Sequence, residues 1–181
     1  INEPRHSQFV SGVMVVSNEN VIHLGVPVGP APVYPFWLDK ERELAASIQR
    51  WNQHFLSIRQ RVEVVHKCLA SCLWHPFRCL PIRTVDLRSL QRLLWQYVWQ
   101  TSPDQAATGP ISQAEAVRPI TEGGLAMVDL STKYQALNMY WINKLEITSD
   151  LPEEERPKWY QLMIDIILIS TTDQIQQAIR Y

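Results

Sequence analysis

The sequence predicts a mainly α-helical protein, a helical bundle that follows a short N-terminal β-hairpin. Two observations lead to this fold class. Apolar residues recur at spacings of three and four through most of the chain after residue 36, as in amphipathic helices. The N-terminal segment is instead rich in valine and interrupted by turn-forming residues. With 181 residues, of which 46% are hydrophobic and 19% charged, the chain can bury a core of ordinary size.

We expect three parts, which are a hairpin with a Pro/Gly-rich linker over 1–36, a helical domain over 37–147 and a helical extension over 148–181. The hairpin prediction rests on two valine-rich runs, Phe9–Val16 and Val21–Val28, separated by the turn-forming residues 17–20. Prolines and glycines then predict a loop over 29–36, because proline lacks a backbone donor and glycine relaxes the backbone.

Two apolar stripes predict the first two helices of the bundle. The first has Asp39 as a possible cap near its start and consists of Leu44, Ile48, Trp51 and Phe55. The second follows Ser57 as a candidate cap, is closed by Pro76 and Pro81, and consists of Val62, Val65, Leu69 and Leu73.

A third helix is predicted from about Asp86, and its expected buried residues are Leu87, Leu90, Leu94, Tyr97 and Val98. Residues 101–118 are expected to form a surface loop, and Gly123-Gly124 a turn. Ser131 or Thr132 is expected to start a fourth helix, with one face formed by Tyr134, Leu137, Trp141 and Leu145. The acidic run Glu153–Glu155 suits the start of a fifth helix, expected to carry Trp159, Leu162, Met163, Ile166 and Ile167. A short sixth helix is expected near Thr172.

Three cysteines, Cys68, Cys72 and Cys79, predict reduced thiols rather than a disulfide framework. Cys68, Cys72 and His75 are spaced to share one helix face, which leaves a metal site open. Zinc, however, usually needs four convergent ligands, or three with a water. The alternative, which we favour, is that the cysteines are small core residues packed against Leu69 and Leu73. We expect no metal and no cofactor.

The charge of the chain is concentrated in its middle. Residues 50–92 hold eight lysines and arginines against two acidic residues, whereas both flanking segments are acidic. Such a basic window can be a nucleic-acid footprint. It can equally be neutralised by the acidic segments of the same chain, and the charges alone do not separate the two interpretations.

No catalytic motif is present. The sequence has no glycine-rich phosphate loop, no zinc-protease helix motif, no nucleophile elbow and no adjacent pair of aspartates that could hold two metal ions. Most of the seven tryptophans lie in or beside the apolar stripes and are expected in the core. We therefore expect no catalytic residue and no enzymatic activity in this chain alone.

A series of short motifs carries a family resemblance. In order, they are His23–Gly29, Ile48–Trp51, Leu56–Val62, Leu69–Trp74, Leu80-Pro81, Leu93–Trp99, Pro119 with Gly123–Leu130, Ala136-Leu137 and Trp141. Their order resembles the region that follows the catalytic palm in reverse transcriptases of non-LTR (LINE-type) retrotransposons. The resemblance covers about residues 21–145.

The resemblance implies that the helical domain is a thumb, which grips a template–primer duplex without performing chemistry. The positions that match the family motifs are Leu24, Gly25, Trp51, Leu56, Ser57, Trp99, Gly123, Gly124 and Leu125. Phosphate contacts are expected from basic residues that face solvent and line one concave side, namely Arg59, Arg61, Lys67, Arg88 and Arg92.

Some features depart from the family pattern. Gln60 stands where the family usually has glycine, so the backbone there must avoid positive φ. Residues 101–116 hold no lysine or arginine, and the catalytic aspartates of the family lie upstream of the matching region. The alternative is a domesticated fold that binds a protein partner in a larger assembly.

Apolar runs such as Ile166–Ile169 are too short to cross a membrane. No signal peptide is visible, so we expect a nuclear or cytoplasmic protein.

Overall fold

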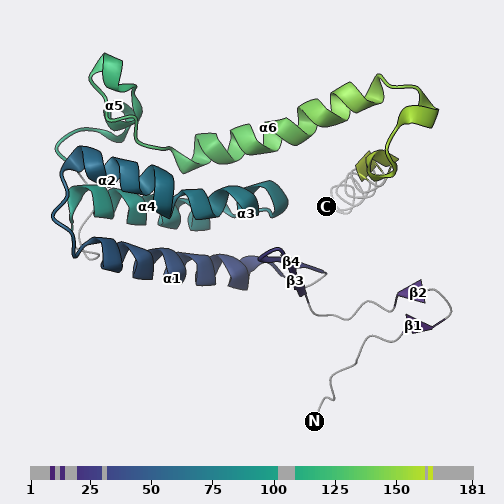
Figure 1. Ribbon diagram of the computed structural model, residues 1–181, viewed down its shortest axis with the longest axis horizontal. Helices are drawn as coiled ribbons and strands as arrows, with labels where there is room; N and C mark the ends of the chain where they lie inside the picture. The colour runs from purple at the N-terminus through teal and green to yellow at the C-terminus, as the bar shows by residue number, and fades with distance from the viewer. Residues whose placement is uncertain are drawn as a thin grey trace, which may run out of the picture. The chain divides into compact units, whose positions relative to one another are not determined.

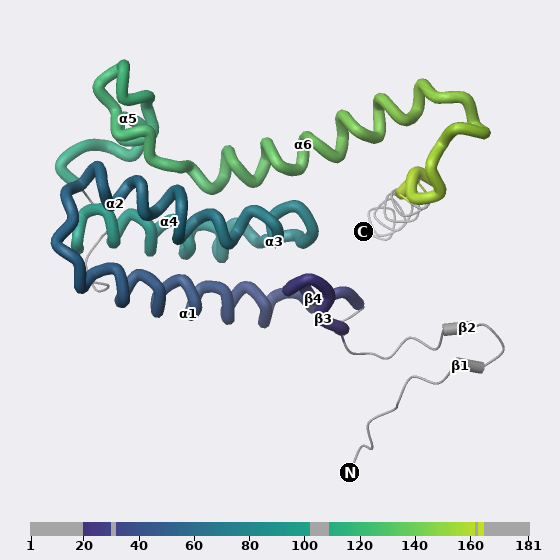
Figure 2. Tube along the Cα trace, in the orientation of Figure 1, coloured from purple at the N-terminus to yellow at the C-terminus, as the bar shows by residue number. Residues whose placement is uncertain are grey.

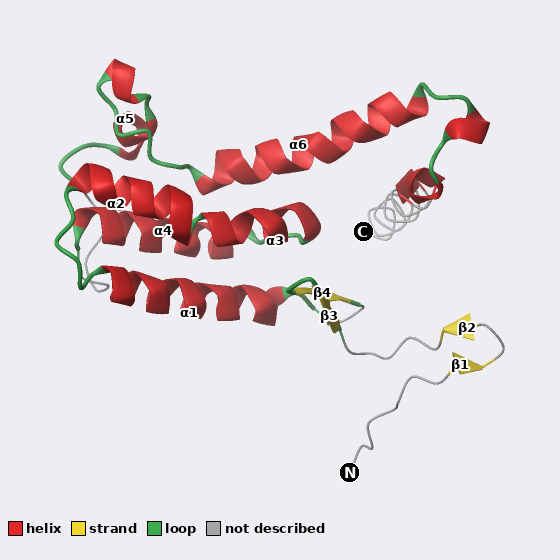
Figure 3. Ribbon diagram, viewed as in Figure 1, coloured by secondary structure: helices red, strands yellow, loops and turns green. Residues whose placement is uncertain are grey.

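A computed structural model describes residues 9–10, 13–14, 20–29, 32–101, 109–161 and 163–164. Well over half of these residues are helical, and the strands are short and N-terminal (Figures 1 and 3). The predicted fold class, a mainly helical bundle with an N-terminal hairpin, is confirmed. The chain divides into two compact units, Ile1–Gln135 and Ala136–Tyr181. The boundaries proposed at residues 36 and 147 stay predictions.

The N-terminal strands pair differently from the sequence prediction. β1 (Phe9–Val10) pairs with β2 (Val13–Met14), and β3 (Val21–His23) pairs with β4 (Val26–Val28). Each valine-rich run thus folds back on itself, whereas we expected the two runs to pair with each other. The reason is the dipeptide Leu24-Gly25, in which both residues have positive φ, 50° and 79°. That is the requirement of a two-residue type I′ hairpin turn.

Helix α1 (Tyr34–Trp51) begins inside the segment that we expected to be a loop. Pro35 lies in its first turn, where the backbone needs no donor, so proline does not prevent a helix there. Asp39 consequently lies within the helix and accepts from Arg42 at 2.8 Å, so its prediction as a cap is wrong. Phe55, expected on the buried stripe, follows the end of the helix and is fully exposed.

The second predicted helix is present but irregular. α2 (Ile58–Val64) continues through a π-helical turn, Val65–Leu69, and a 3₁₀ turn, Ser71–Leu73, into α3 (Trp74–Cys79) (Figure 2). Ser57 is confirmed as the cap, and Gln60 completes the capping box by accepting from the Ser57 backbone N–H at 2.9 Å. Pro76 does not end the helix as expected, because it lies in the first turn of α3.

Helix α4 (Thr84–Trp99) provides the centre of the first unit and packs against both α1 and α2. All five residues predicted to be buried on it are buried. The preceding helical segments contribute further buried side chains, which are Val62, Val65, Leu69, Leu73 and Phe77. Polar links add to this packing, since Trp37 Nε1 donates to Pro81 O at 2.8 Å. The face that α4 buries is therefore the one that the apolar periodicity predicted, whereas of the first predicted stripe only Leu44 is buried.

The segment after α4 contains a helix that the sequence analysis missed. α5 (Gln113–Val117) lies within the predicted loop 101–118 and is started by a capping box of Ser112 and Glu115. A 3₁₀ turn, Ile120–Glu122, leads into Gly123, which has a φ of 83°. The predicted turn at Gly123-Gly124 is thus present.

The remaining helices begin near the predicted positions. Helix α6 (Leu130–Ser149) is capped by Asp129, whose carboxylate accepts from Ser131 N and Thr132 Oγ1, so neither Ser131 nor Thr132 is the cap. The acidic run forms a 3₁₀ turn, Glu153–Glu155, and helical residues follow at 158–161 and 163–164. Leu162, Ile166, Ile167 and the helix expected near Thr172 lie outside the described residues. In the part of the chain that is described, no helix combines the length and apolarity needed to cross a membrane.

Candidate nucleic-acid interface

The basic window keeps most of its charge on the surface. Seven of its basic side chains belong to exposed residues, which are Arg50, Arg59, Lys67, Arg78, Arg83, Arg88 and Arg92. Against them stands one exposed acidic residue, Glu63, because Asp86 is buried. Asp86 accepts two hydrogen bonds from Arg83, at 2.8 and 2.9 Å. The surface contributed by residues 50–92 is therefore strongly positive.

Arg61 differs from the other predicted phosphate contacts because it is half-buried. Its Nε donates to Leu56 O at 3.0 Å, and its Nη1 donates to Val98 O at the end of α4. The guanidinium thus ties the start of α2 to the C-terminus of α4, where backbone carbonyls lack helical partners. We expected Arg61 to face solvent, and it does not.

The other predicted contacts come from two helical segments, Arg59 and Lys67 from the one that begins with α2 and Arg88 and Arg92 from α4. That they line one concave side stays a prediction. Arg59 lines a small cavity of about 170 Å3 together with Gly124 and Leu125. Lys67 forms an ion pair with Glu63 at 2.7 Å, which raises the pKa of Lys67 and lowers that of Glu63. Both side chains are exposed, and such pairs contribute little to stability.

Arg88 and Arg92 form the basic surface with the simplest geometry. They lie one helical turn apart on α4, both exposed, on the side of the helix away from Leu90 and Leu94. Within the described residues, neither side chain has a hydrogen-bond or ion-pair partner. Two unpaired guanidinium groups at this spacing can contact neighbouring phosphates of one nucleic-acid strand.

A cavity of about 420 Å3 lies beside these arginines, between α4 and α5. Its lining consists of Gln91, Trp95, Gln113, Ala114, Val117 and Asp129. Trp95 is 2% exposed and stacks on Trp99, with ring centroids 6.3 Å apart and planes 8° apart. The cavity therefore has a fixed aromatic wall together with polar side chains from three segments of the chain.

Gln91 is a site residue that the sequence analysis missed. Its amide donates to Val128 O at 3.2 Å and accepts from Leu130 N at 2.7 Å, so one side chain holds the backbone that starts α6. No local signal marks this role, because a glutamine on a helix is usually solvated. By contrast, the S-x-x-E pattern at Ser112–Glu115 is a capping-box signature, and it could have predicted α5.

The positions that match the family motifs have structural roles. Ser57 caps α2, and Trp99 packs so closely on Gly109 that a side chain there would collide with the indole. A side chain on Gly124 would collide with the backbone of Arg118, and Leu125 N donates to Ala116 O at 3.2 Å. Leu24 and Gly25 form the hairpin turn, whereas Trp51 and Leu56 are half-buried near the end of α1 and the start of α2.

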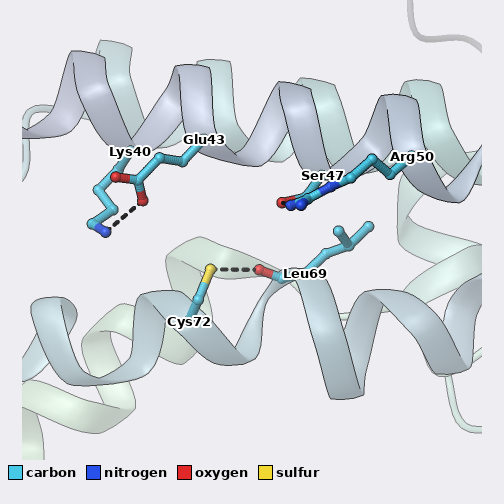
Figure 4. Close-up of polar contacts among 6 residues, drawn as sticks. All are labelled: Lys40, Glu43, Ser47, Arg50, Leu69 and Cys72. Atoms are coloured by element: carbon cyan, nitrogen blue, oxygen red, sulfur yellow. Dashed lines mark hydrogen bonds and ion pairs between the residues drawn. The ribbon is translucent and has the colours of Figure 1, made fainter.

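The cysteines are not core residues, which corrects the sequence prediction. Cys68, Cys72 and Cys79 are all exposed, although Leu69 and Leu73, against which we expected them to pack, are buried. Cys72 Sγ donates to Leu69 O at 2.9 Å on the side that faces Lys40 and Glu43 of α1 (Figure 4). Partial burial of this sulfur raises the pKa of the thiol.

The described residues assemble no cluster of metal ligands. No three histidine, cysteine or acidic side chains in the described ranges converge as metal ligands, so Cys68, Cys72 and His75 do not form the site that their spacing left open. Cys79 Sγ lies 3.9 Å from His75 Nδ1, but both residues are exposed. The buried hydroxyl of Tyr97 has no hydrogen-bond partner among the described residues, and burial raises the pKa of this hydroxyl.

Comparison with known proteins identifies no relative. The chain matches no family model, no curated protein and no solved structure. The resemblance to reverse transcriptases therefore stays a hypothesis, and the functional argument depends on the site itself.

Proposed function

We propose that the chain is a non-catalytic nucleic-acid-binding module that grips the phosphate backbone of a duplex, as the thumb of a retrotransposon-type reverse transcriptase does. The observation that carries this proposal is the charge of the surface over residues 50–92, where seven exposed basic residues stand against one exposed acidic residue. Phosphate contacts of this kind give affinity and orientation without reading the sequence.

The two unpaired arginines of α4 are the centre of the proposed contact. A guanidinium that is exposed and unpaired can exchange water and counterions for a phosphate without breaking an internal bond. Arg88 and Arg92 meet this condition among the described residues, whereas Arg61 would have to leave Leu56 O and Val98 O. We therefore assign Arg88 and Arg92 to binding, together with Arg59 and Lys67, and Arg61 to the fold.

The test is a titration of a labelled RNA–DNA hybrid by fluorescence anisotropy at several salt concentrations. Each phosphate that the protein neutralises contributes about 0.9 to the slope of log affinity against log salt on a B-form duplex. Arg92→Ala should lower the affinity for every sequence alike and reduce that slope by about one. The control is Arg42→Ala, which removes an exposed charge, paired with Asp39, from α1, outside the basic window.

Two outcomes would contradict the proposal. One is binding that does not weaken as salt rises, because phosphate contacts release counterions. The other is an equal loss of affinity in Arg42→Ala and Arg92→Ala, which would mean that net charge rather than the surface of α4 matters.

A second candidate function is a domesticated fold that binds a protein partner. It is favoured by α6, on which large apolar residues are exposed, namely Met139, Tyr140, Ile142 and Ile147. Contiguous exposed apolar surface often marks protein contacts. The same titration separates the two, since this alternative predicts no detectable duplex binding near physiological salt.

A further inference from the structure

We propose that the cavity between α4 and α5 receives one unpaired nucleobase that carries an exocyclic amino group, at the single-stranded end of a bound nucleic acid. This inference rests on the proposed function and narrows its substrate from any duplex to a duplex with an overhang. The base would lie in the cavity, whereas the phosphates of the same strand would stay outside, on Arg88 and Arg92.

The position of the cavity relative to the arginines supports this division. Arg88 precedes Gln91 by three residues and Arg92 precedes Trp95 by three, so each arginine is a helical-face neighbour of a residue that lines the cavity. No basic side chain is part of the lining, and Asp129 contributes a carboxylate. A phosphate is therefore disfavoured inside the cavity and favoured at its edge.

The chemistry of the lining fits a base. Unpaired bases are commonly bound by aromatic contact together with hydrogen bonds to their edges. Val117 supplies most of the apolar surface, since Trp95 is only 2% exposed, whereas Gln91 and Gln113 supply amides that can donate and accept. The volume of about 420 Å3 lies in the range of small-ligand pockets.

The polar groups are held in place yet not saturated. Asp129 accepts one hydrogen bond at each carboxylate oxygen, from Ser131 N and Thr132 Oγ1, which uses about half of its capacity. The Gln91 amide likewise uses one donor and one acceptor on Val128 and Leu130. These internal bonds fix both side chains before a ligand arrives. Free acceptor sites on a carboxylate favour bases with an amino group, which are adenine, cytosine and guanine rather than thymine.

The experiment compares three RNA–DNA hybrids with the same duplex length, one blunt, one with a short adenine overhang and one with a matching thymine overhang. We expect the adenine overhang to bind about 5- to 100-fold more tightly than the blunt hybrid, the range expected for stacking of a single base. The thymine overhang should bind less tightly than the adenine overhang. A fluorescent adenine analogue in the overhang should be quenched on binding.

Cavity-filling variants provide the second arm. Ala114 is exposed on α5 and lines the cavity, so Ala114→Trp should abolish the overhang preference and leave the affinity for the blunt hybrid unchanged. Ala46→Trp is the matched control on an exposed part of α1 and should keep the preference. Gln113→Ala, at another exposed position of α5, should reduce the preference without filling the cavity.

The results separate this inference from the proposed function. Salt-dependent binding of all three hybrids with equal affinity, or a preference that survives both Ala114→Trp and Gln113→Ala, would overturn the cavity assignment and leave the duplex-binding function standing. Equal binding of adenine and thymine overhangs would overturn the amino-group assignment. Failure of every hybrid to bind would overturn the proposed function and this inference together.

Discussion

Helices α4 and α6 are both long, yet they use their apolar residues in opposite ways. α4 buries one face completely, with Leu90, Leu94 and Val98 at most 1% exposed, and presents arginines on the other. α6 distributes its apolar residues around the helix, so that Met139, Ile142 and Ile147 are each about half or more exposed. Segregation of apolar and polar residues therefore creates the core and the charged surface on the same helix, α4, whereas α6 lacks this segregation.

The largest expected effect tests this contrast directly. Leu94→Ala should lower the free energy of unfolding by about 2 to 5 kcal/mol, because it leaves a cavity at a fully buried position of α4. Ile147→Ala removes a side chain from α6 that is 68% exposed and should change the free energy by at most about 0.5 kcal/mol. Urea denaturation of both variants gives the comparison. Similar losses in the two variants would show that the exposed apolar residues of α6 are covered in solution.

The next largest effect is the difference in stability between replacing Arg61, which bonds backbone carbonyls, and replacing Arg88, which is exposed. Arg61→Met removes the guanidinium that bonds Leu56 O and Val98 O, and it should destabilise the fold by about 1 to 3 kcal/mol. Arg88→Met, at an exposed position, should leave the stability within about 0.5 kcal/mol of the original value and weaken nucleic-acid binding. Thermal melts and binding isotherms should thus give opposite rankings. If Arg61→Met keeps its stability but loses nucleic-acid binding, Arg61 contacts phosphate rather than stabilising the fold.

The start of α6 provides a smaller effect. Asp129→Ala removes the side chain that accepts from Ser131 N and Thr132 Oγ1, and loss of such a cap costs about 1 kcal/mol. Ser131→Ala is the control, since the Ser131 backbone rather than its side chain makes the bond to Asp129. Hydrogen exchange at the Ser131 amide should accelerate in Asp129→Ala alone. Unchanged exchange would mean that Gln91, through Leu130 N, is sufficient to start the helix.

The smallest expected effect is the pH dependence of stability that comes from α5, the helix between α4 and α6 in the chain. The backbone N–H of Ser112, followed by its hydroxyl, donates to Glu115 and lowers the pKa of that carboxyl. A carboxyl with a lowered pKa stabilises the folded form above its unfolded pKa, and this contribution is lost as pH falls through the folded value. An NMR titration should place the pKa of Glu115 below the ordinary value of a glutamate side chain. Glu115→Gln keeps an acceptor in the capping box and should remove this part of the acid sensitivity.

The sequence by itself determined α2 and α4, and the face that α4 buries. Spacings of three and four place Leu87, Leu90 and Leu94 on one side of a helix, whatever the rest of the chain does. The Ser57 cap was equally readable, since its partner Gln60 is only three residues away. The same local rules were sufficient to find α5, although its five residues lie in a segment whose glycine and prolines suggested a loop.

Only the tertiary structure decided which polar residues belong to the fold and which remain free. Arg59 and Arg61 are the same residue type on the same helix, so the sequence does not distinguish them. In the fold, Arg61 donates a hydrogen bond to the carbonyl of Val98, 37 residues away. The amide of Gln91 finds its partner 39 residues away, at Leu130. The cysteines, which we expected in the core, are exposed although Leu69 and Leu73 beside them are buried. Such contacts depend on where other helices end, which no local periodicity contains, so the candidate cavity and its arginines became visible only after folding.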